Sequence, residues 1–170
     1  MNRVGEELVT IALGKANADE IDLFGRSAIN RFYYACFLDA RKALLCIHPS
    51  LAIKHKELPT NIKKTIAEIV RREISRLERQ TVISTNEAIT YRATLNNIVS
   101  NLAEILENAY KLRVIADYEP DKKAVKVGWN VVIDGKSSAM ARDWHRRTEQ
   151  SVARMMRLWR DLGHETTSKI

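Results

Sequence analysis

The sequence predicts an all-α protein, a bundle of about five helices, and three observations lead to this fold class. Apolar residues recur at the three-to-four-residue spacing of helices over most of the chain. Glycine and proline, which interrupt helices, number only 6 and 3 among 170 residues. The hydrophobic share of 45% and the charged share of 29% are typical of a globular protein. We therefore expect one folded domain over residues 1–165, because a chain of this length can bury a sizeable core.

The first two helices follow from apolar spacing and from a proline. The pattern predicts a helix over Val4–Ala18 and a longer helix over Phe24–Ile47. The second helix is expected to end there because Pro49 disfavours helical backbone in the residue before it. The inward side of the first helix is expected to carry Leu8, Ile11 and Ala12.

A basic loop and two further helices are expected next. Residues His48–Thr60 are predicted to form a loop with a basic cluster around His55. A third helix is predicted over Asn61–Thr81, and a fourth, capped by Thr85 or Asn86, continues to about residue 116. The apolar stripe of the third helix is Ile62, Ile66, Ile69, Val70 and Leu77.

After Pro120 the pattern changes from helical to extended. Residues 124–133 are rich in valine and end at the turn signal Asp134-Gly135, so a short β-hairpin is expected there. A fifth helix is predicted over Ser138–Leu162. Its apolar side holds Trp144, Val152, Met155, Trp159 and Leu162, and its opposite side holds Arg142, Arg146, Arg157 and Arg160. The basic side is either a solvated face or part of a phosphate-binding surface.

Net charge and cysteine usage constrain the partners and the compartment. The formal charge of +7 favours a polyanionic partner, most simply RNA or DNA. No apolar run is long enough to span a bilayer, and the first 15 residues lack the apolar block of a secretion signal. Cys36 and Cys46 are expected on one helix about 15 Å apart, too far for a disulfide. We expect free core thiols, a cytoplasmic location and no membrane partner.

The second predicted helix carries polar residues that an apolar helix rarely buries. Within one sector of its helical wheel lie Asn30, Arg31, Tyr34 and Arg41. A buried arginine needs a carboxylate or several carbonyl groups, and we expect Arg31 to pair with Asp117. Arg113 lies one helical turn before Asp117, and Tyr34 and Tyr118 can contribute hydroxyl groups. The pair either fixes how the helices pack or belongs to a functional site.

Several classes of enzyme are disfavoured. The chain has no glycine-rich phosphate loop and no serine or cysteine nucleophile motif, and its four histidines lack metal-ligand spacing. The sequence therefore argues against an NTPase, a hydrolase with a catalytic triad and a zinc enzyme. It predicts neither a metal nor a cofactor.

Two stretches carry distinctive motifs: Asn30–Phe37 reads NRFYYACF, and Leu112–Tyr118 reads LRVIADY. They are similar to the R-x-Y-Y-A-x-F motif and the later L-R-x-x-A-D-Y motif of the HEPN superfamily, in particular of its small prokaryotic branch. The resemblance covers roughly residues 8–118. It implies a helical bundle that dimerises, with its polar site at or near the dimer cleft, and it makes residues 119–136 an insertion.

The resemblance also implies an activity. Many HEPN proteins are metal-independent ribonucleases, often toxins paired with a nucleotidyltransferase-type antitoxin, in which an arginine and a following histidine act on the 2′-hydroxyl and the scissile phosphate. Arg113 takes the arginine position, but Asp117 and Tyr118 stand where the histidine is expected. His55 is the histidine that could fold back over the site. The expected arginine-then-histidine motif is therefore not intact.

We expect a protein of a prokaryotic toxin–antitoxin or defence type that acts on RNA as a metal-independent endoribonuclease in a homodimer. The catalytic candidates are Arg113, Asp117, Tyr118, Arg31 and His55. The binding candidates are Asn30, Tyr34, Arg41, Arg142 and Arg146. Two alternatives stay open: a non-catalytic HEPN module that binds nucleic acid, a nucleotide or a nucleotidyltransferase-type partner, and an assembly subunit whose polar cluster is structural.

Overall fold

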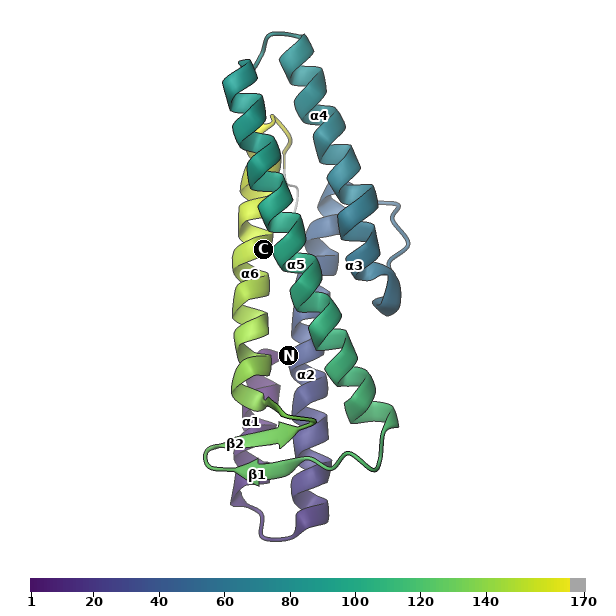
Figure 1. The fold of residues 1–170 in the computed structure, drawn as a ribbon, viewed down its shortest axis with the longest axis vertical. Helices are drawn as coiled ribbons and strands as arrows, with labels where there is room; N and C mark the ends of the chain where they lie inside the picture. Colours follow the sequence, from purple (N-terminus) through teal and green to yellow (C-terminus); the bar gives the residue numbers. More distant parts are fainter. Residues whose placement is uncertain (166–170) are drawn as a thin grey trace. The chain divides into compact units, whose positions relative to one another are not determined.

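The computed structural model describes residues 1–165, whose helices and strands are drawn in Figure 1. The chain divides into two compact units. The first unit consists of Met1–Leu38 and Ile105–Arg147, and the second of Asp39–Glu104 and the described residues from Thr148 onward. Three helices contribute residues to both units: α2 (Ala18–Ile47), α5 (Thr85–Tyr118) and α6 (Ser138–Asp161). The all-α class with a short hairpin is confirmed. The single domain expected over residues 1–165 stays a prediction.

In the first unit, α1 (Asn2–Gly14) begins two residues before the predicted start and ends four residues before the predicted end. Its buried side runs through Gly5, Val9 and Ala12, which are spaced by four and three residues. The expectation that Ile11 faces inward is wrong, because this residue lies off that stripe and is 42% exposed. A Cβ atom at Gly5 would lie 2.8 Å from the ring of Phe32, so the glycine permits close packing of α1 on α2.

The long helix α2 begins at Ala18, six residues earlier than predicted, and ends at Ile47 as predicted. Its start is set by Asn17, whose Oδ1 accepts hydrogen bonds from the backbone N–H groups of Asp19 (2.8 Å) and Glu20 (3.2 Å). These bonds satisfy two N–H groups that have no partner inside the helix.

The predicted hairpin is present and includes a third strand, giving an antiparallel sheet in the order β1-β2-β3. The strands are β1 (Val125–Val127), β2 (Asn130–Ile133) and β3 (Lys136–Ser137). Asp134 and Gly135 have φ values of 48° and 72° between the paired residues Ile133 and Lys136. Positive φ at both central positions is the type I′ geometry for which Asp-Gly is favoured, so the turn signal is confirmed.

The sheet packs on α2 in the first unit through a glycine. A Cβ atom at Gly25 would lie 2.5 Å from Cγ1 of Val131 and 2.9 Å from Cβ of Ala124, so only glycine fits this contact. Val131 and Ile133 are buried, and Val125, Val127 and Trp129 are exposed. The hairpin therefore has one face on the core and one in solvent.

In the second unit, the stretch predicted as a loop contains two short helices, η1 (His55–Glu57) and α3 (Leu58–Asn61). A π-helical turn, Ile62–Ile66, continues into α4 (Ala67–Arg79). The apolar stripe begins earlier than predicted, because Leu58 is buried four residues before Ile62.

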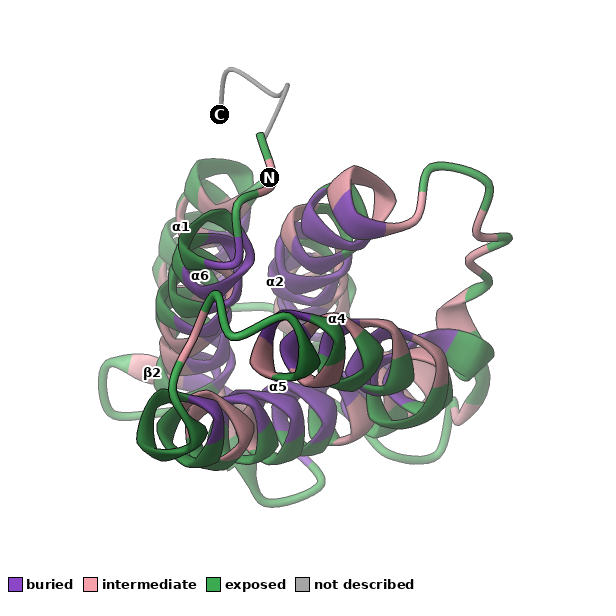
Figure 2. Ribbon diagram, turned by 90° about the horizontal axis from the view of Figure 1, so that it is seen from above, coloured by how far each residue is buried: buried purple, intermediate pink, exposed green. Residues whose placement is uncertain are grey.

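The start of α5 is fixed by a capping box one residue before the predicted cap. The backbone N–H of Glu87 donates to Oγ of Ser84 (3.2 Å), and the N–H of Ser84 donates to Oε2 of Glu87 (2.7 Å). Buried residues lie along one side of α4 and α5 and exposed residues along the other (Figure 2). This division is the one expected for amphipathic helices around a core.

The helix α6 begins as predicted and ends one residue earlier. Its buried side contains Trp144, Met155 and Trp159, Leu162 directly after the helix is also buried, and Val152 is only half-buried. Its four predicted outer arginines are all exposed. The thiols of Cys36 and Cys46 are free; the first is buried and the second half-buried. No described helix combines the length and apolar content needed to cross a membrane.

Candidate functional site

A polar cluster lies in the first unit where the N-terminal part of α2 faces the C-terminal end of α5. We call it the Arg113 cluster, and its members are Asn30, Tyr33, Tyr34, Tyr110, Arg113, Asp117 and Tyr118. Arg113 and Asp117 are four residues apart on α5, so their side chains share one face of the helix. The prediction that these two residues face the same way is therefore confirmed.

The centre of the cluster is an ion pair. Nε of Arg113 lies 2.6 Å from Oδ2 of Asp117, and the two side chains are 17% and 21% exposed. The Nε–H makes no hydrogen bond, so this contact is one of charge and not of hydrogen-bond geometry. The other carboxylate oxygen, Oδ1, accepts a hydrogen bond from Nδ2 of Asn30. Both oxygens of Asp117 are therefore occupied.

Arg113 is positively charged at every physiological pH, and its surroundings favour the charged form further. Burial alone would lower the pKa of this guanidinium, but the Asp117 charge and the neighbouring Tyr118 raise it above its ordinary value. The guanidinium carbon lies 5.4 Å from the centre of the Tyr118 ring, a cation–π distance. Tyr118 is 67% exposed, so the cation and the phenol lie together at an open end of α5.

The inner side of the cluster is aromatic. The Tyr33 ring lies 5.5 Å from that of Tyr34 and 6.0 Å from that of Tyr110, centre to centre. Burial raises the pKa of Tyr33 far above its ordinary value, so its phenol stays protonated at all physiological pH values. Oδ1 of Asn30 is buried with no hydrogen-bond partner among the described residues. This oxygen is an unused acceptor beside the ion pair.

The predicted Arg31–Asp117 pair is wrong. Arg31 is exposed, and Asp117 contacts Arg113 and Asn30 instead. Arg31 and Asn30 are adjacent in the sequence and therefore about 100° apart around the helix axis. Because Asn30 faces α5, Arg31 is turned toward solvent.

The other candidate residues lie outside the Arg113 cluster. Arg142 and Arg146 are exposed in the first unit, where Nε of Arg142 lies 3.5 Å from Oε1 of Glu6 and Arg146 donates to Asp143. Arg41, exposed on α2, and His55, half-buried in η1, belong to the second unit. The first unit thus assembles Asn30, Tyr34, Arg113, Asp117 and Tyr118 from the predicted set.

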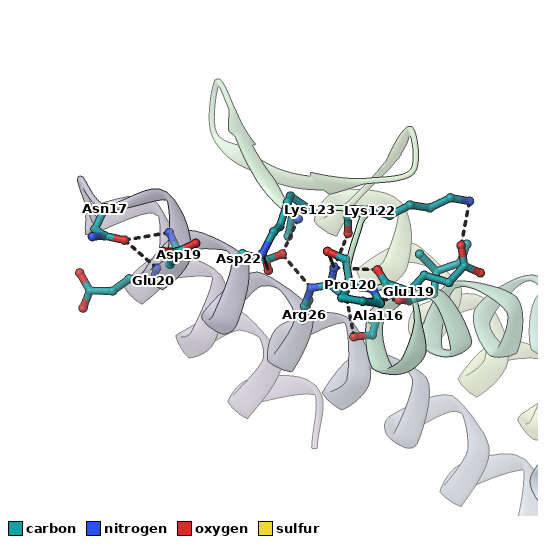
Figure 3. A network of polar contacts seen from close by, with 12 residues as sticks. Asn17, Asp19, Glu20, Asp22, Arg26, Ala116, Glu119, Pro120, Lys122 and Lys123 are labelled. Carbon is teal, nitrogen blue, oxygen red and sulfur yellow. Dashed lines mark hydrogen bonds and ion pairs between the residues drawn. The ribbon is translucent and has the colours of Figure 1, made fainter.

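A second polar network, centred on Arg26, was not predicted (Figure 3). Nε of Arg26 donates to Oδ1 of Asp22 (2.7 Å), and Nη1 donates to the carbonyl groups of Ile115 (3.2 Å) and Ala116 (2.9 Å). Nη2 donates to the carbonyl groups of Glu119, Pro120 and Lys122. The guanidinium therefore ties the last turn of α5 and the chain after it to α2.

The carboxylate of Asp22 completes this network. Its Oδ1 also accepts the backbone N–H of Ala124 (2.6 Å), and Nζ of Lys123 lies 3.4 Å from Oδ2. Burial would raise the pKa of Asp22, but the bonds from Ala124 and Arg26 outweigh this effect and hold the pKa below its ordinary value. The four-residue spacing of Asp22 and Arg26 was the available sequence signal.

The two networks differ in what they can do. All donors of Arg26 face protein acceptors, so its role is structural. In the Arg113 cluster the guanidinium is held by the ion pair with Asp117 and by the ring of the exposed Tyr118, so its remaining N–H donors suit the recognition of an anionic ligand. Its one carboxylate is neutralised by arginine, so the cluster is a poor cation site.

A comparison with protein-family models, with curated proteins and with solved structures finds no match for this chain.

Proposed function

We propose that this protein is an RNA-directed module of the HEPN type that holds an RNA phosphate group at Arg113 and does not cut the strand. The observation that carries the proposal is the Arg113 cluster, in which the guanidinium carbon of Arg113 lies 5.4 Å from the ring centre of the exposed Tyr118. Arginine suits phosphate because its planar fork of donors matches two phosphate oxygens. The net charge of +7 supports a polyanionic ligand.

Binding is favoured over cleavage by the state of the groups near Arg113. Metal-free cleavage needs a general base within hydrogen-bond reach of the 2′-hydroxyl. The carboxylate of Asp117 is engaged by Arg113 and Asn30 on its two oxygens, and Tyr33 is held protonated by burial. Neither group is poised to accept a proton.

A metal-independent endoribonuclease is the second candidate. Tyr118 favours it, because a solvent-exposed phenol next to a guanidinium supplies a proton-transfer group and a phosphate-binding group together. For both candidates we also propose, from the HEPN resemblance, a homodimer and a nucleotidyltransferase-type antitoxin partner in a prokaryotic toxin–antitoxin or defence pair. Light scattering of the purified chain tests the homodimer.

The deciding experiment measures RNA binding and cleavage on the same samples without metal ions. Wild type, Arg113→Ala and Lys111→Ala are compared with a labelled single-stranded RNA and with a mixed tRNA and mRNA pool. Lys111 is an exposed cation on the same helix, so its variant controls for the loss of one positive charge. Circular dichroism of each variant checks that the helices persist.

We expect intact RNA in every lane, salt-dependent binding by the wild type, and a loss of about tenfold in affinity for Arg113→Ala with a salt slope reduced by about one. Lys111→Ala should lose much less. Equal losses for the two variants would contradict a specific role for Arg113. Cleavage by wild type that disappears in Arg113→Ala would establish the second candidate instead.

A further inference from the structure

A hollow of about 210 Å³ lies within the second unit between α5 and α6. We call it the α5–α6 hollow. Its polar lining consists of Thr90, Tyr91 and Thr94 from α5 and Arg154, Arg157 and Asp161 from α6. The three α6 residues are spaced by three and four positions, so they share one face of that helix. None of these residues belongs to the Arg113 cluster.

No described carboxylate lies within ion-pair distance of either arginine of the hollow, whereas Arg72, Arg76 and Arg92 of the same unit each pair with a glutamate. By contrast, Arg157 forms no ion pair or hydrogen bond with any residue that the structure describes. With Asp161 also in the lining, the hollow keeps one net positive charge.

The guanidinium of Arg154 is held in place by a neutral side chain. It donates from Nη1 to Oδ1 of Asn97 at 3.3 Å, and that oxygen also accepts from Nδ2 of Asn101 at 3.0 Å. An amide acceptor fixes the guanidinium without cancelling its charge. The remaining donors of Arg154 are therefore available to an anion in the hollow.

The other lining residues add features that free phosphate does not need. Tyr91 is half-buried and offers an aromatic surface on which a base can stack. Asp161 carries a carboxylate that can accept hydrogen bonds from ribose hydroxyl groups but would repel a bare phosphate. The volume is below the roughly 300–1,000 Å³ of pockets for drug-sized ligands, so the hollow can hold at most one nucleotide unit, part of which stays outside it.

We propose that the α5–α6 hollow binds one nucleotide unit, with its phosphate on Arg154 and Arg157 and its base or ribose against Tyr91 and Asp161. This inference deepens the proposed function and rests on it for the source of the ligand, since the unit belongs to an RNA strand. A free mononucleotide has the same chemistry and is the other source that the test separates. The Arg113 cluster and the hollow are then two independent phosphate contacts.

The test uses the full chain and three probes: a labelled single-stranded RNA, adenosine monophosphate and inorganic phosphate. Arg157→Ala is compared with Arg160→Ala, an exposed arginine on the same helix that does not line the hollow. Tyr91→Ala and Tyr91→Phe separate stacking from hydrogen bonding. Arg113→Ala is measured in parallel.

For Arg157→Ala we expect an affinity for RNA about tenfold lower and a salt slope smaller by about one, with a much smaller effect for Arg160→Ala. Tyr91→Ala should weaken RNA binding several-fold, and Tyr91→Phe should not. Equal effects of Arg157→Ala and Arg160→Ala, or no effect of either, would overturn the proposal.

The remaining outcomes distinguish the two proposals. If Arg113→Ala weakens RNA binding and Arg157→Ala does not, the hollow proposal fails and the proposed function stands. If adenosine monophosphate binds in an Arg157-dependent way but RNA does not, the hollow is a mononucleotide site and the proposed function fails. If the wild type binds none of the three probes, both are wrong.

Discussion

Replacing Arg26 with methionine should strongly destabilise the first unit. Methionine keeps much of the apolar stem but leaves Asp22, whose side chain is only 11% exposed, without its main counter-charge. Removing one partner of a buried ion pair costs about 3–5 kcal/mol, and the residual exposure of both side chains argues for the lower end, about 3 kcal/mol. For a chain of this size the melting temperature should fall by about 6–12 °C.

Arg31→Met is the matched control, because Arg31 is an arginine on the same helix and in the same unit but is exposed. Its substitution should change stability by about 0.5 kcal/mol or less. Thermal melts followed by circular dichroism measure both variants. A loss of stability for Arg31→Met equal to or greater than that for Arg26→Met would refute the assignment of Arg26 as the buried, paired arginine.

A double-mutant cycle makes the test specific to the Arg26–Asp22 pair. Asp22→Asn removes the charge but keeps an acceptor for the backbone N–H of Ala124. In the Arg26→Met background this second change should cost much less than in wild type, with a coupling of about 1–3 kcal/mol. Additive effects within about 0.5 kcal/mol would show that the two side chains do not stabilise one another.

Three further predictions concern packing, capping and acid stability. Gly25→Ala should lower stability by about 1–3 kcal/mol because the hairpin must move, whereas Gly14→Ala, with nothing within 4 Å of the new Cβ, should not; thermal melts compare them. Ser84→Ala should cost about 1 kcal/mol by removing the cap of α5, and urea titration measures it. The lowered pKa of Asp22 means that its stabilisation is full above the ordinary value of 3.8 and is lost as the pH falls through the folded-state pKa. Asp22→Asn should therefore show a shallower fall of melting temperature below about pH 5 than wild type, and an unchanged acid limb would contradict this.

The helices could be predicted from their apolar spacing, whereas only some of their ends could be, such as the end of α2 and the start of α6. Pro49 forces an end by its ring, and α2 ends at Ile47 as expected. The start of α2 depends on Asn17, and that of α5 on Ser84 with Glu87. Caps of this kind depend on one side-chain rotation, so nearby Asn, Ser and Thr residues are equally good candidates in a sequence.

The polar contacts, too, could be predicted only in part from the sequence. The Arg113–Asp117 pair follows from four-residue spacing on one helix. The prediction placed Arg31 on the inward side because Asn30 and Arg31, about 100° apart around the helix axis, were assigned to one broad sector of the wheel. Only packing decides which of the two faces inward. In the Arg26 network only the Asp22–Arg26 pair has a sequence signal, since the other acceptors of Arg26 are backbone carbonyl groups about 90 residues away, which any residue type can supply.

The interleaving of the two units along the chain has a consequence for dissecting the protein genetically. The second unit is built from Asp39–Glu104 and from residues after Arg147, so neither unit is a contiguous reading frame that a single truncation can isolate. A chain divided in the turn between α4 and α5 gives two fragments that each hold part of both cores. Neither fragment can complete a core alone, and each must find the other to do so. This turn is therefore the natural place to split the protein for a complementation reporter whose signal requires reassembly.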